Sequence, residues 1–187
     1  GLDGTDSSAA AVELTKTGII VYASWEDHGQ GADAGMLGTA HNALLPLEIS
    51  PSDIKLVMND TAITPNSGPA GGSRSQVMTG NAIKVSCELL LAGMRKPDGS
   101  FRTYDEMVAE NIPLRYDGSW TATNGVACDD KGQGKPFTTY MYGVFMSEVT
   151  VDTKTGKTKV DKITLMADVG SINNRLVVDG QMYGGLA

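Results

Sequence analysis

The sequence predicts an α+β fold, in which mixed sheets carry helices packed on one face. Short runs rich in β-branched residues, as at 17–24, alternate with stretches whose apolar residues recur at helical spacing, as at 78–92. Two longer runs of strand character, 140–151 and 158–169, flank a short turn and indicate an antiparallel hairpin. A chain of 187 residues is also long enough to bury a real core.

The first third of the chain reads as alternating elements. Residues 1–15 are small and polar with a run of alanines, and we expect an irregular or helical segment there. The strand at 17–24 leads into a turn with two glycines, and residues 36–47 predict a helix that ends at a proline. Residues 53–59 alternate in polarity, which predicts a second strand with one buried face.

The remainder contains further helix and strand signals. Thr103 followed by Glu106 matches a capping box and predicts the start of a short helix. Residues 113–137 are rich in turn residues and hold one candidate strand around Trp120. Residues 179–187 are typical of the beginning of a helix.

Composition excludes several function classes. With 15 basic and 22 acidic residues the net charge is −7, which disfavours nucleic acid as a partner. No apolar run approaches the roughly 18 residues that span a bilayer, and the start of the chain lacks a secretory signal, so we expect a cytoplasmic protein. Cys87 and Cys128 make no metal-binding pair and are either two reduced thiols or one disulfide. His28 and His41 are too few for a zinc centre.

Glycine is over-represented, with 23 residues where an average usage of ~7% would give about 13. Two glycine-rich turns each precede an amphipathic helix, a context in which backbone N–H groups bind anions. The turns are His28-Gly29-Gln30-Gly31-Ala32-Asp33 and Gly71-Gly72-Ser73-Arg74-Ser75-Gln76. The forked guanidinium of Arg74 and the hydroxyls of Ser73 and Ser75 would suit a pyrophosphate. Neither turn matches a dinucleotide fingerprint or a P-loop, so ordinary helix-start turns remain the alternative.

The order of these segments resembles the molybdenum-binding region of the xanthine oxidase family of molybdenum hydroxylases. The local sequence around Gly29-Gln30-Gly31 is most similar to that of the bacterial aldehyde oxidoreductases of sulfate reducers. Other segments that match in order are Asp60-Thr61, Pro65-Asn66, Gly71-Gly72-Ser73-Arg74-Ser75, Gly80-Asn81-Ala82, Ala167-Asp168-Val169-Gly170, Asn173-Asn174, Gly180-Gln181 and Gly184-Gly185. The resemblance covers roughly residues 16–187.

The resemblance implies an enzyme that oxidises aldehydes to carboxylic acids with water as the oxygen source. Its cofactor is molybdopterin cytosine dinucleotide with molybdenum, and electrons leave through [2Fe–2S] clusters. Carried over by motif, Gln30 would hydrogen-bond an oxo ligand of molybdenum, whereas no residue here would bind the metal directly. Residues 28–33 would line the pterin and its pyrophosphate, residues 71–76 would form a second cradle, and Gln181 would approach the pterin from a third loop.

The sequence also departs from the family pattern. The catalytic glutamate of the family lies in a Gly-x-Gly-Glu segment, and no such segment occurs here; the cysteine-rich modules that hold the iron–sulfur clusters are absent too. We therefore expect a fragment of a larger enzyme. In it, residues 1–15 precede a partial cofactor-binding domain at 16–187 that lacks its C-terminal portion and is inactive alone.

The resemblance further implies partners: an aldehyde substrate, the rest of the parent enzyme, a redox acceptor such as flavodoxin or ferredoxin, and a second copy in a homodimer. Two alternatives remain. One is a non-catalytic α+β binding or scaffold domain whose glycine turns serve only the fold. The other is a different branch of the same family, a purine or N-heterocycle hydroxylase.

Overall fold

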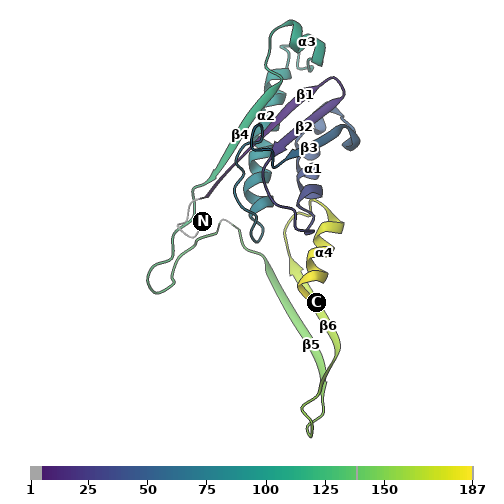
Figure 1. Ribbon diagram of the computed structural model, residues 1–187, viewed down its shortest axis with the longest axis vertical. Helices are drawn as coiled ribbons and strands as arrows, with labels where there is room; N and C mark the ends of the chain where they lie inside the picture. The colour runs from purple at the N-terminus through teal and green to yellow at the C-terminus, as the bar shows by residue number, and fades with distance from the viewer. Residues whose placement is uncertain (1–5, 138, 187) are drawn as a thin grey trace. The chain divides into compact units, whose positions relative to one another are not determined.

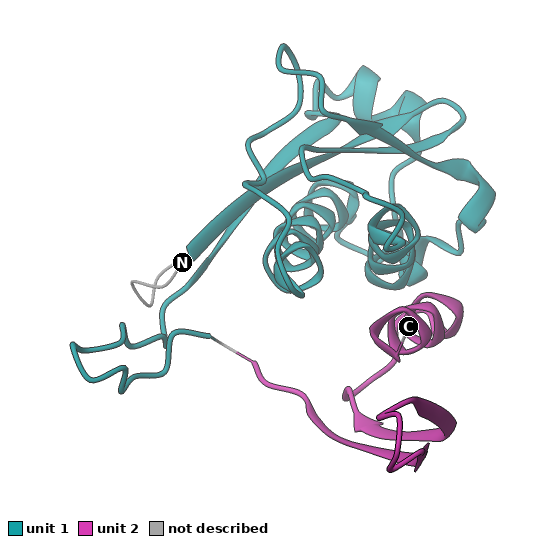
Figure 2. Ribbon diagram, turned by 60° about the horizontal axis from the view of Figure 1, so that its bottom comes forward, with its two compact units in different colours: residues 1–138 teal, residues 139–187 magenta. Residues whose placement is uncertain are grey.

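The computed structural model of the protein describes residues 6–137 and 139–186. The chain forms two compact units, residues 1–138 and residues 139–187, which Figure 2 shows in different colours. Among the helices in the described parts, none is long and apolar enough to cross a membrane. The predicted α+β class with mixed sheets is confirmed.

A four-stranded mixed sheet is the framework of the first unit (Figure 1). Its strands are β1 (Asp6–Thr15), β2 (Gly18–Ala23), β3 (Ile54–Met58) and β4 (Arg115–Ala122). Their order is β3-β2-β1-β4; β1 is antiparallel to both of its neighbours, and β2 is parallel to β3. The two strands predicted on either side of the first helix are confirmed, as is the candidate strand of the turn-rich region.

The N-terminal segment corrects one prediction, because Asp6–Thr15 is a central strand and the expectation of an irregular or helical segment is wrong. The strand β1 is hydrogen-bonded on both edges, to β2 and to β4. Ala10, Ala11 and Val12 are completely buried. Alanine favours helices locally, but sheet pairing on two sides and burial outweigh that preference.

The two long helices of the first unit, α1 (Ala32–Ala43) and α2 (Gly80–Met94), pack on one face of the sheet, as predicted (Figure 2). The other helical elements of this unit are a 3₁₀ turn at Leu45–Leu47, another at Pro51–Asp53, a π-helical turn at Ser75–Thr79 and the short helix α3 (Tyr104–Ala109). Gly118 in β4 lets α2 approach closely, since a Cβ there would lie 2.7 Å from the backbone nitrogen of Ser86. The core between helices and sheet includes Trp25, Met36 and Ile83, each at most 1% exposed.

The capping box that the sequence predicts is present at the start of α3. The Thr103 side chain accepts the Glu106 N–H at 3.3 Å, and the Glu106 carboxylate accepts the Thr103 N–H at 2.8 Å. The carboxylate also pairs with Lys96 at 2.6 Å. The Lys96 hydrogen bond holds the pKa of Glu106 below its usual value.

The parallel pair β2 and β3 sets the position of both glycine-rich loops. Helix α1 connects these strands, so the chain leaves both of them at the same edge of the sheet. Residues 24–31 follow β2 and lead into α1, and residues 59–74 follow β3 and lead to the π-helical turn before α2. The carboxyl edge of parallel strands is where α/β proteins commonly bind ligands.

The second unit contains the predicted hairpin. The strands β5 (Tyr142–Val151) and β6 (Thr158–Asp168) are antiparallel, with one irregularity in register after Glu148. The turn is closed by Asp152, whose carboxylate accepts the Lys154 N–H at 2.8 Å. That bond is the main reason why the pKa of Asp152 lies below its usual value.

A helix follows the hairpin, but it begins earlier than the sequence analysis predicts. Helix α4 spans Arg175–Leu186, whereas the sequence indicated a beginning at 179. The side chain of Asn174 accepts the N–H groups of Leu176 at 3.1 Å and of Val177 at 3.3 Å, which caps the first turn. The Asn174 cap was not recognised in the sequence.

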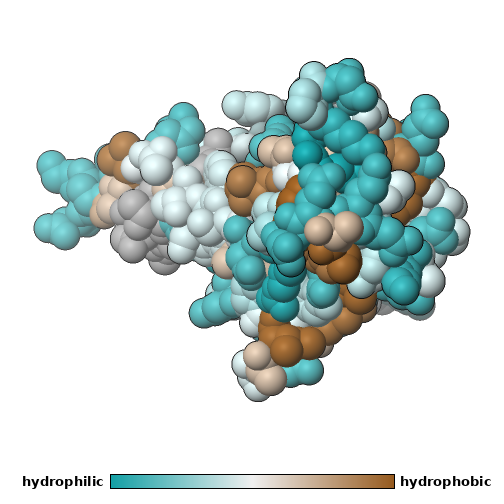
Figure 3. All heavy atoms as spheres, turned by 90° about the horizontal axis from the view of Figure 1, so that it is seen from above, coloured by the Kyte–Doolittle hydropathy of each residue, from teal (hydrophilic) through white to brown (hydrophobic). Residues whose placement is uncertain are grey.

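Both cysteines are free thiols, which agrees with the first of the two alternatives. Cys87 is buried in α2, and Cys128 is exposed. Burial raises the pKa of the Cys87 thiol to about 12, with a smaller contribution from Glu88. On the face seen in Figure 3, hydrophobic residues (brown) reach the solvent among hydrophilic ones, partly as single side chains and partly as a connected band.

Candidate functional site

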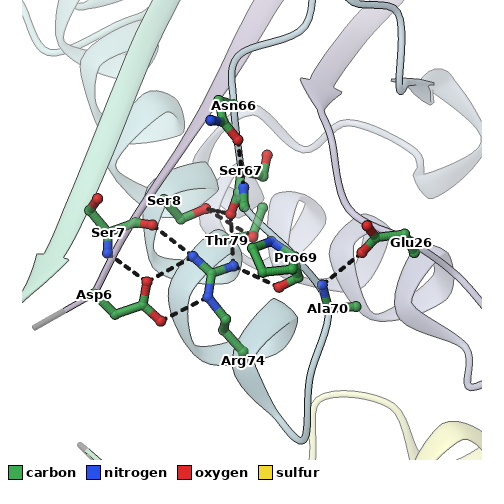
Figure 4. A network of polar contacts seen from close by, with 11 residues as sticks. Asp6, Ser7, Ser8, Glu26, Asn66, Ser67, Pro69, Ala70, Arg74 and Thr79 are labelled. Atoms are coloured by element: carbon green, nitrogen blue, oxygen red, sulfur yellow. Dashed lines mark hydrogen bonds and ion pairs between the residues drawn. The ribbon is translucent and has the colours of Figure 1, made fainter. Parts of the chain in front are cut away.

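The loops after β2 and β3 are bonded to each other. Ser24 and Ser67 exchange hydrogen bonds, each backbone N–H donating to the hydroxyl of the other at 2.8 and 2.9 Å. The Ser24 hydroxyl also donates to the Pro65 carbonyl at 2.7 Å. Further along, the Ala70 N–H donates to the carboxylate of Glu26 at 2.7 Å (Figure 4). The two glycine-rich turns, far apart in sequence, are therefore neighbours.

The helices that follow the two loops are also linked to each other by side-chain contacts. Gln76, in the π-helical turn before α2, donates its side-chain amide to the Thr39 hydroxyl of α1 at 3.0 Å. A Cβ at Gly35 would lie only 2.7 Å from the Gln76 amide oxygen, so a side chain there would collide with it. The structure thus brings residues 28–33 and 71–76 together in one unit.

The first loop has its own internal anion. The carboxylate of Asp27 accepts the backbone N–H groups of Gly29 at 2.8 Å, Gly31 at 3.3 Å and Asp33 at 3.0 Å, just where α1 begins at Ala32. These backbone hydrogen bonds, that of Asp33 first, hold the pKa of Asp27 below its usual value. The expectation that this turn offers unpaired N–H groups to an anionic ligand is therefore wrong.

The other side chains of the first loop fold onto neighbouring groups. The amide oxygen of Gln30 accepts the His28 N–H at 2.5 Å, and its nitrogen donates to the Glu26 carbonyl at 2.9 Å. The carboxylate of Asp33 accepts the indole N–H of the buried Trp25 at 3.1 Å. His28 is exposed and Gln30 is half-buried, so both remain within reach of a ligand.

The guanidinium of Arg74 is directed into the protein. Its five N–H groups all have protein acceptors: both carboxylate oxygens of Asp6 at 2.7 and 2.9 Å, and the carbonyls of Ser7 at 2.7 Å, Ser67 at 2.8 Å and Pro69 at 2.9 Å (Figure 4). The expectation that Arg74 offers its fork to a pyrophosphate is therefore corrected: the arginine fastens the second loop to β1. The Arg74 hydrogen bond also holds the pKa of Asp6 below its usual value.

Buried hydroxyl groups support the same loop from behind. Ser8 bonds the Ser67 carbonyl and the Thr79 hydroxyl, both at 2.9 Å, and all three residues are at most 3% exposed. Gly68 is also required, because it has φ +75° and a Cβ there would lie 2.5 Å from an Arg74 nitrogen. The second loop is therefore a rigidly held segment despite its lack of helix or strand.

Both loops expose glycine backbone that has free space in front of it. A Cβ built on Gly29, Gly71 or Gly72 would meet nothing within 4 Å, so a ligand can approach these backbones closely. Ser73 is exposed, whereas Ser75 is buried as the first residue of the π-helical turn. Bare glycine backbone with a hydroxyl at a helix start suits a bulky ligand with anionic groups.

The last predicted site residue, Gln181, lies in the second unit, exposed on α4. No cluster of three or more His, Cys, Asp or Glu residues that could hold a metal ion occurs within residues 6–137 and 139–186. The twelve predicted residues of the first unit are thus neighbours, and Gln181 belongs to the other unit.

Three acidic residues that shape the site were not predicted. Asp27 stands two positions before Gly29, and an Asp at that spacing commonly bonds the backbone of its own turn, which was a usable signal. Glu26 and Asp6 bond residues 44 and 68 positions away, and nothing local in the sequence marks them.

Comparisons with known proteins agree on one family. The family model described as "Molybdopterin cofactor-binding domain" matches residues 1–187. Aldehyde oxidoreductase of Megalodesulfovibrio gigas is 59% identical over 189 residues, which cover 100% of this chain and 21% of that protein. Xanthine dehydrogenase/oxidase of Mus musculus is 28% identical and is matched over 91% of this chain and 13% of its own length.

A solved structure has the same fold. The crystal structure of aldehyde oxidoreductase from Desulfovibrio desulfuricans matches with a TM-score of 0.94 and 63% identity, covering 100% of this chain and 21% of that one. The chain therefore spans about a fifth of the length of its aldehyde oxidoreductase relatives. The glycine-rich loops, their order and these matches together place the chain in the molybdopterin cofactor-binding domain family, within the xanthine oxidase family.

Proposed function

We propose that the protein is part of a molybdenum-dependent aldehyde oxidoreductase, which oxidises aldehydes to carboxylic acids with water as the oxygen source. We propose further that this chain binds molybdopterin cytosine dinucleotide. The observation that carries the proposal is the pairing of two glycine-rich loops at one sheet edge, with open backbone at Gly29, Gly71 and Gly72. The 59% identity to a protein named aldehyde oxidoreductase favours this branch over purine or N-heterocycle hydroxylases.

The second loop binds the anionic groups of the cofactor in this proposal. Gly71 and Gly72 admit close approach to the backbone, and the exposed Ser73 provides a hydroxyl donor. Arg74 contributes by holding the loop against β1 rather than by contact with the ligand. A π-helical turn directly after the loop agrees with a functional role, since such turns are frequent at functional sites.

The first loop orients the cofactor through side chains. Gln30 carries an amide N–H₂ suited to an oxo ligand, and rotation about its side-chain bonds redirects this group from the Glu26 carbonyl. His28, with its exposed ring, lines the pterin, and Gln181 contributes from the second unit. When bound, the cofactor supplies the oxidation chemistry, and the protein supplies orientation and electrostatics.

The remaining parts of the proposed enzyme come from outside this chain. They are the general-base glutamate, the [2Fe–2S] clusters, and a surface for a redox acceptor such as flavodoxin or ferredoxin. We propose a cytoplasmic homodimer.

Metal and nucleotide analysis of the intact protein tests the proposal. We expect about one molybdenum per chain and the release of a cytidine nucleotide on acid treatment, because the chain resembles a cofactor-binding domain along its whole length. Oxidation of an aldehyde with a dye as electron acceptor should accompany them. An intact protein without molybdenum and without nucleotide would contradict the proposal, and an adenine or guanine nucleotide would contradict its cytosine form.

A further inference from the structure

Asp27 occupies the position where an anion would bind at the start of α1. Its two carboxylate oxygens accept three backbone N–H groups, those of Gly29, Gly31 and Asp33, at 2.8 to 3.3 Å. Gly29 and Gly31 have φ of +98° and +81°, a left-handed conformation that turns successive N–H groups toward one point. The chain itself thus provides the acceptor for this concave set of donors.

The charge of this carboxylate is well placed. It lies at the positive end of the α1 dipole, which stabilises a negative group. Hydrogen bonds from the backbone hold the pKa of Asp27 below its usual value, so the carboxylate is ionised at neutral pH. An ionised carboxylate at this point repels a phosphate, so the first loop meets a ligand through its other groups.

The bonds to Asp27 also determine how the rest of the loop is presented. Gln30 lies between the two glycines that the carboxylate holds, and Glu26, the residue before Asp27, bonds Ala70 of the second loop at 2.7 Å. A change in the shape of the turn would therefore move Gln30 relative to the second loop.

We infer that Asp27 is a positioning residue of the proposed cofactor site: its carboxylate holds the Gly29–Gly31 turn in one shape, presents Gln30 to the cofactor and leaves the anionic groups of the cofactor to the second loop. The inference rests on the proposed function. It assigns to Asp27 no contact with the cofactor.

Two substitutions in the full-length protein test the inference: Asp27→Ala, which removes all three acceptor bonds, and Asp27→Asn, which has the same shape and keeps one acceptor oxygen. Asp130→Asn, at an exposed loop position of the same unit, is the matched control. Hydrogen exchange of the amides at 29–33, molybdenum retained after prolonged dialysis, and the thermal midpoint are measured for each.

We expect Asp27→Ala to raise exchange at the Gly29, Gly31 and Asp33 amides by about tenfold, the factor that corresponds to losing a hydrogen bond to a charged acceptor. Retained molybdenum should fall several-fold, with Asp27→Asn intermediate and Asp130→Asn equal to wild type. If Asp27→Ala does not fold, the Asn variant decides.

Unchanged exchange in the Asn and Ala variants would overturn the inference, as would faster exchange with wild-type molybdenum retention. The second result would leave Asp27 with a purely structural role. A wild-type protein that contains no molybdenum would count against the proposed function instead, and the exchange rates would still show whether Asp27 holds the turn.

Discussion

The loop after β2 and the loop after β3 both lead from a parallel strand into a helix at the same sheet edge, and both are rich in glycine. Their charged residues act in different ways. In the first loop the carboxylate of Asp27 bonds the backbone of its own turn. In the second loop Arg74 turns away to bond Asp6 of β1, and the backbone of Gly71 and Gly72 stays open.

The difference shows that a charged residue in a glycine-rich turn is not necessarily a ligand group. Asp27 and Arg74 have opposite charges, and each completes the structure of its loop. What the loops leave for a ligand is uncharged: bare glycine backbone, the Ser73 hydroxyl and the side chains of His28 and Gln30. Substitutions at three positions, Arg74, Gly71 and Asp6, separate the structural charges from the ligand-facing groups.

Replacing Arg74 by alanine should have the largest effect. It removes five hydrogen bonds, two of them the bidentate pair with the Asp6 carboxylate, whose side chain is only 23% exposed. We expect the free energy of unfolding of this unit to fall by roughly 3 kcal/mol, measured by urea denaturation. Arg74→Lys should lose most of the same energy, because an ammonium group cannot replace the planar fork.

The matched control for Arg74 is Arg175→Ala. Arg175 also pairs with an aspartate, Asp179, at 2.8 Å, but its side chain is 74% exposed. Exposed pairs of this kind are worth about 0.5 kcal/mol or less. An Arg74→Ala variant as stable as the control, but deficient in molybdenum, would mean that the arginine contacts the ligand after all.

Substitutions of Gly71 should have the opposite effect to Arg74→Ala: they should weaken cofactor binding without lowering the stability of the fold. A Cβ at Gly71 meets no atom within 4 Å and its φ is not positive, so Gly71→Ala and Gly71→Leu should leave the thermal midpoint unchanged. The leucine fills the space in front of the backbone, so molybdenum content should fall about tenfold or more, and the alanine should have a smaller effect. Asn124→Leu, which puts a leucine at an exposed position of another loop, is the control. If the Gly71→Leu variant kept the molybdenum content of the wild type, the result would favour the alternative in which the glycine-rich turns serve only the fold.

The sequence predicted the elements whose signals are local. Periodicity located the strand at 17–24 and the hairpin, and the capping box of Thr103 and Glu106 was recognised from spacing alone. Strand β1 was missed, because its alanines show no strand preference and only pairing on both edges makes them a strand.

The sequence predicted where the candidate site lies, but it did not predict the role of each side chain in the site. Glycine-rich turns before helices can be read from spacing, and twelve of the predicted residues are neighbours in the structure. The partner of Arg74 could not be predicted, because Asp6 lies 68 residues earlier and is brought near by the sheet. Spacing alone cannot show whether a donor is directed to a ligand or to the protein.

The smallest expected effect is the change with pH, near neutrality, in the stabilisation that the Asp6–Arg74 ion pair provides. Arg74 lowers the pKa of Asp6 below the value of 3.8 that it has when unperturbed, so the ionised form is favoured in the folded protein. The stabilisation is therefore complete above about pH 5, where Asp6 is ionised in the unfolded chain as well, and is lost as the pH falls through the lowered pKa. Thermal midpoints of wild type and Asp6→Asn should differ by a constant amount between about pH 5 and 8 and converge in acid. A difference that instead grows or shrinks between about pH 6 and 8 would show that a group other than Asp6 controls the attachment of the second loop to β1.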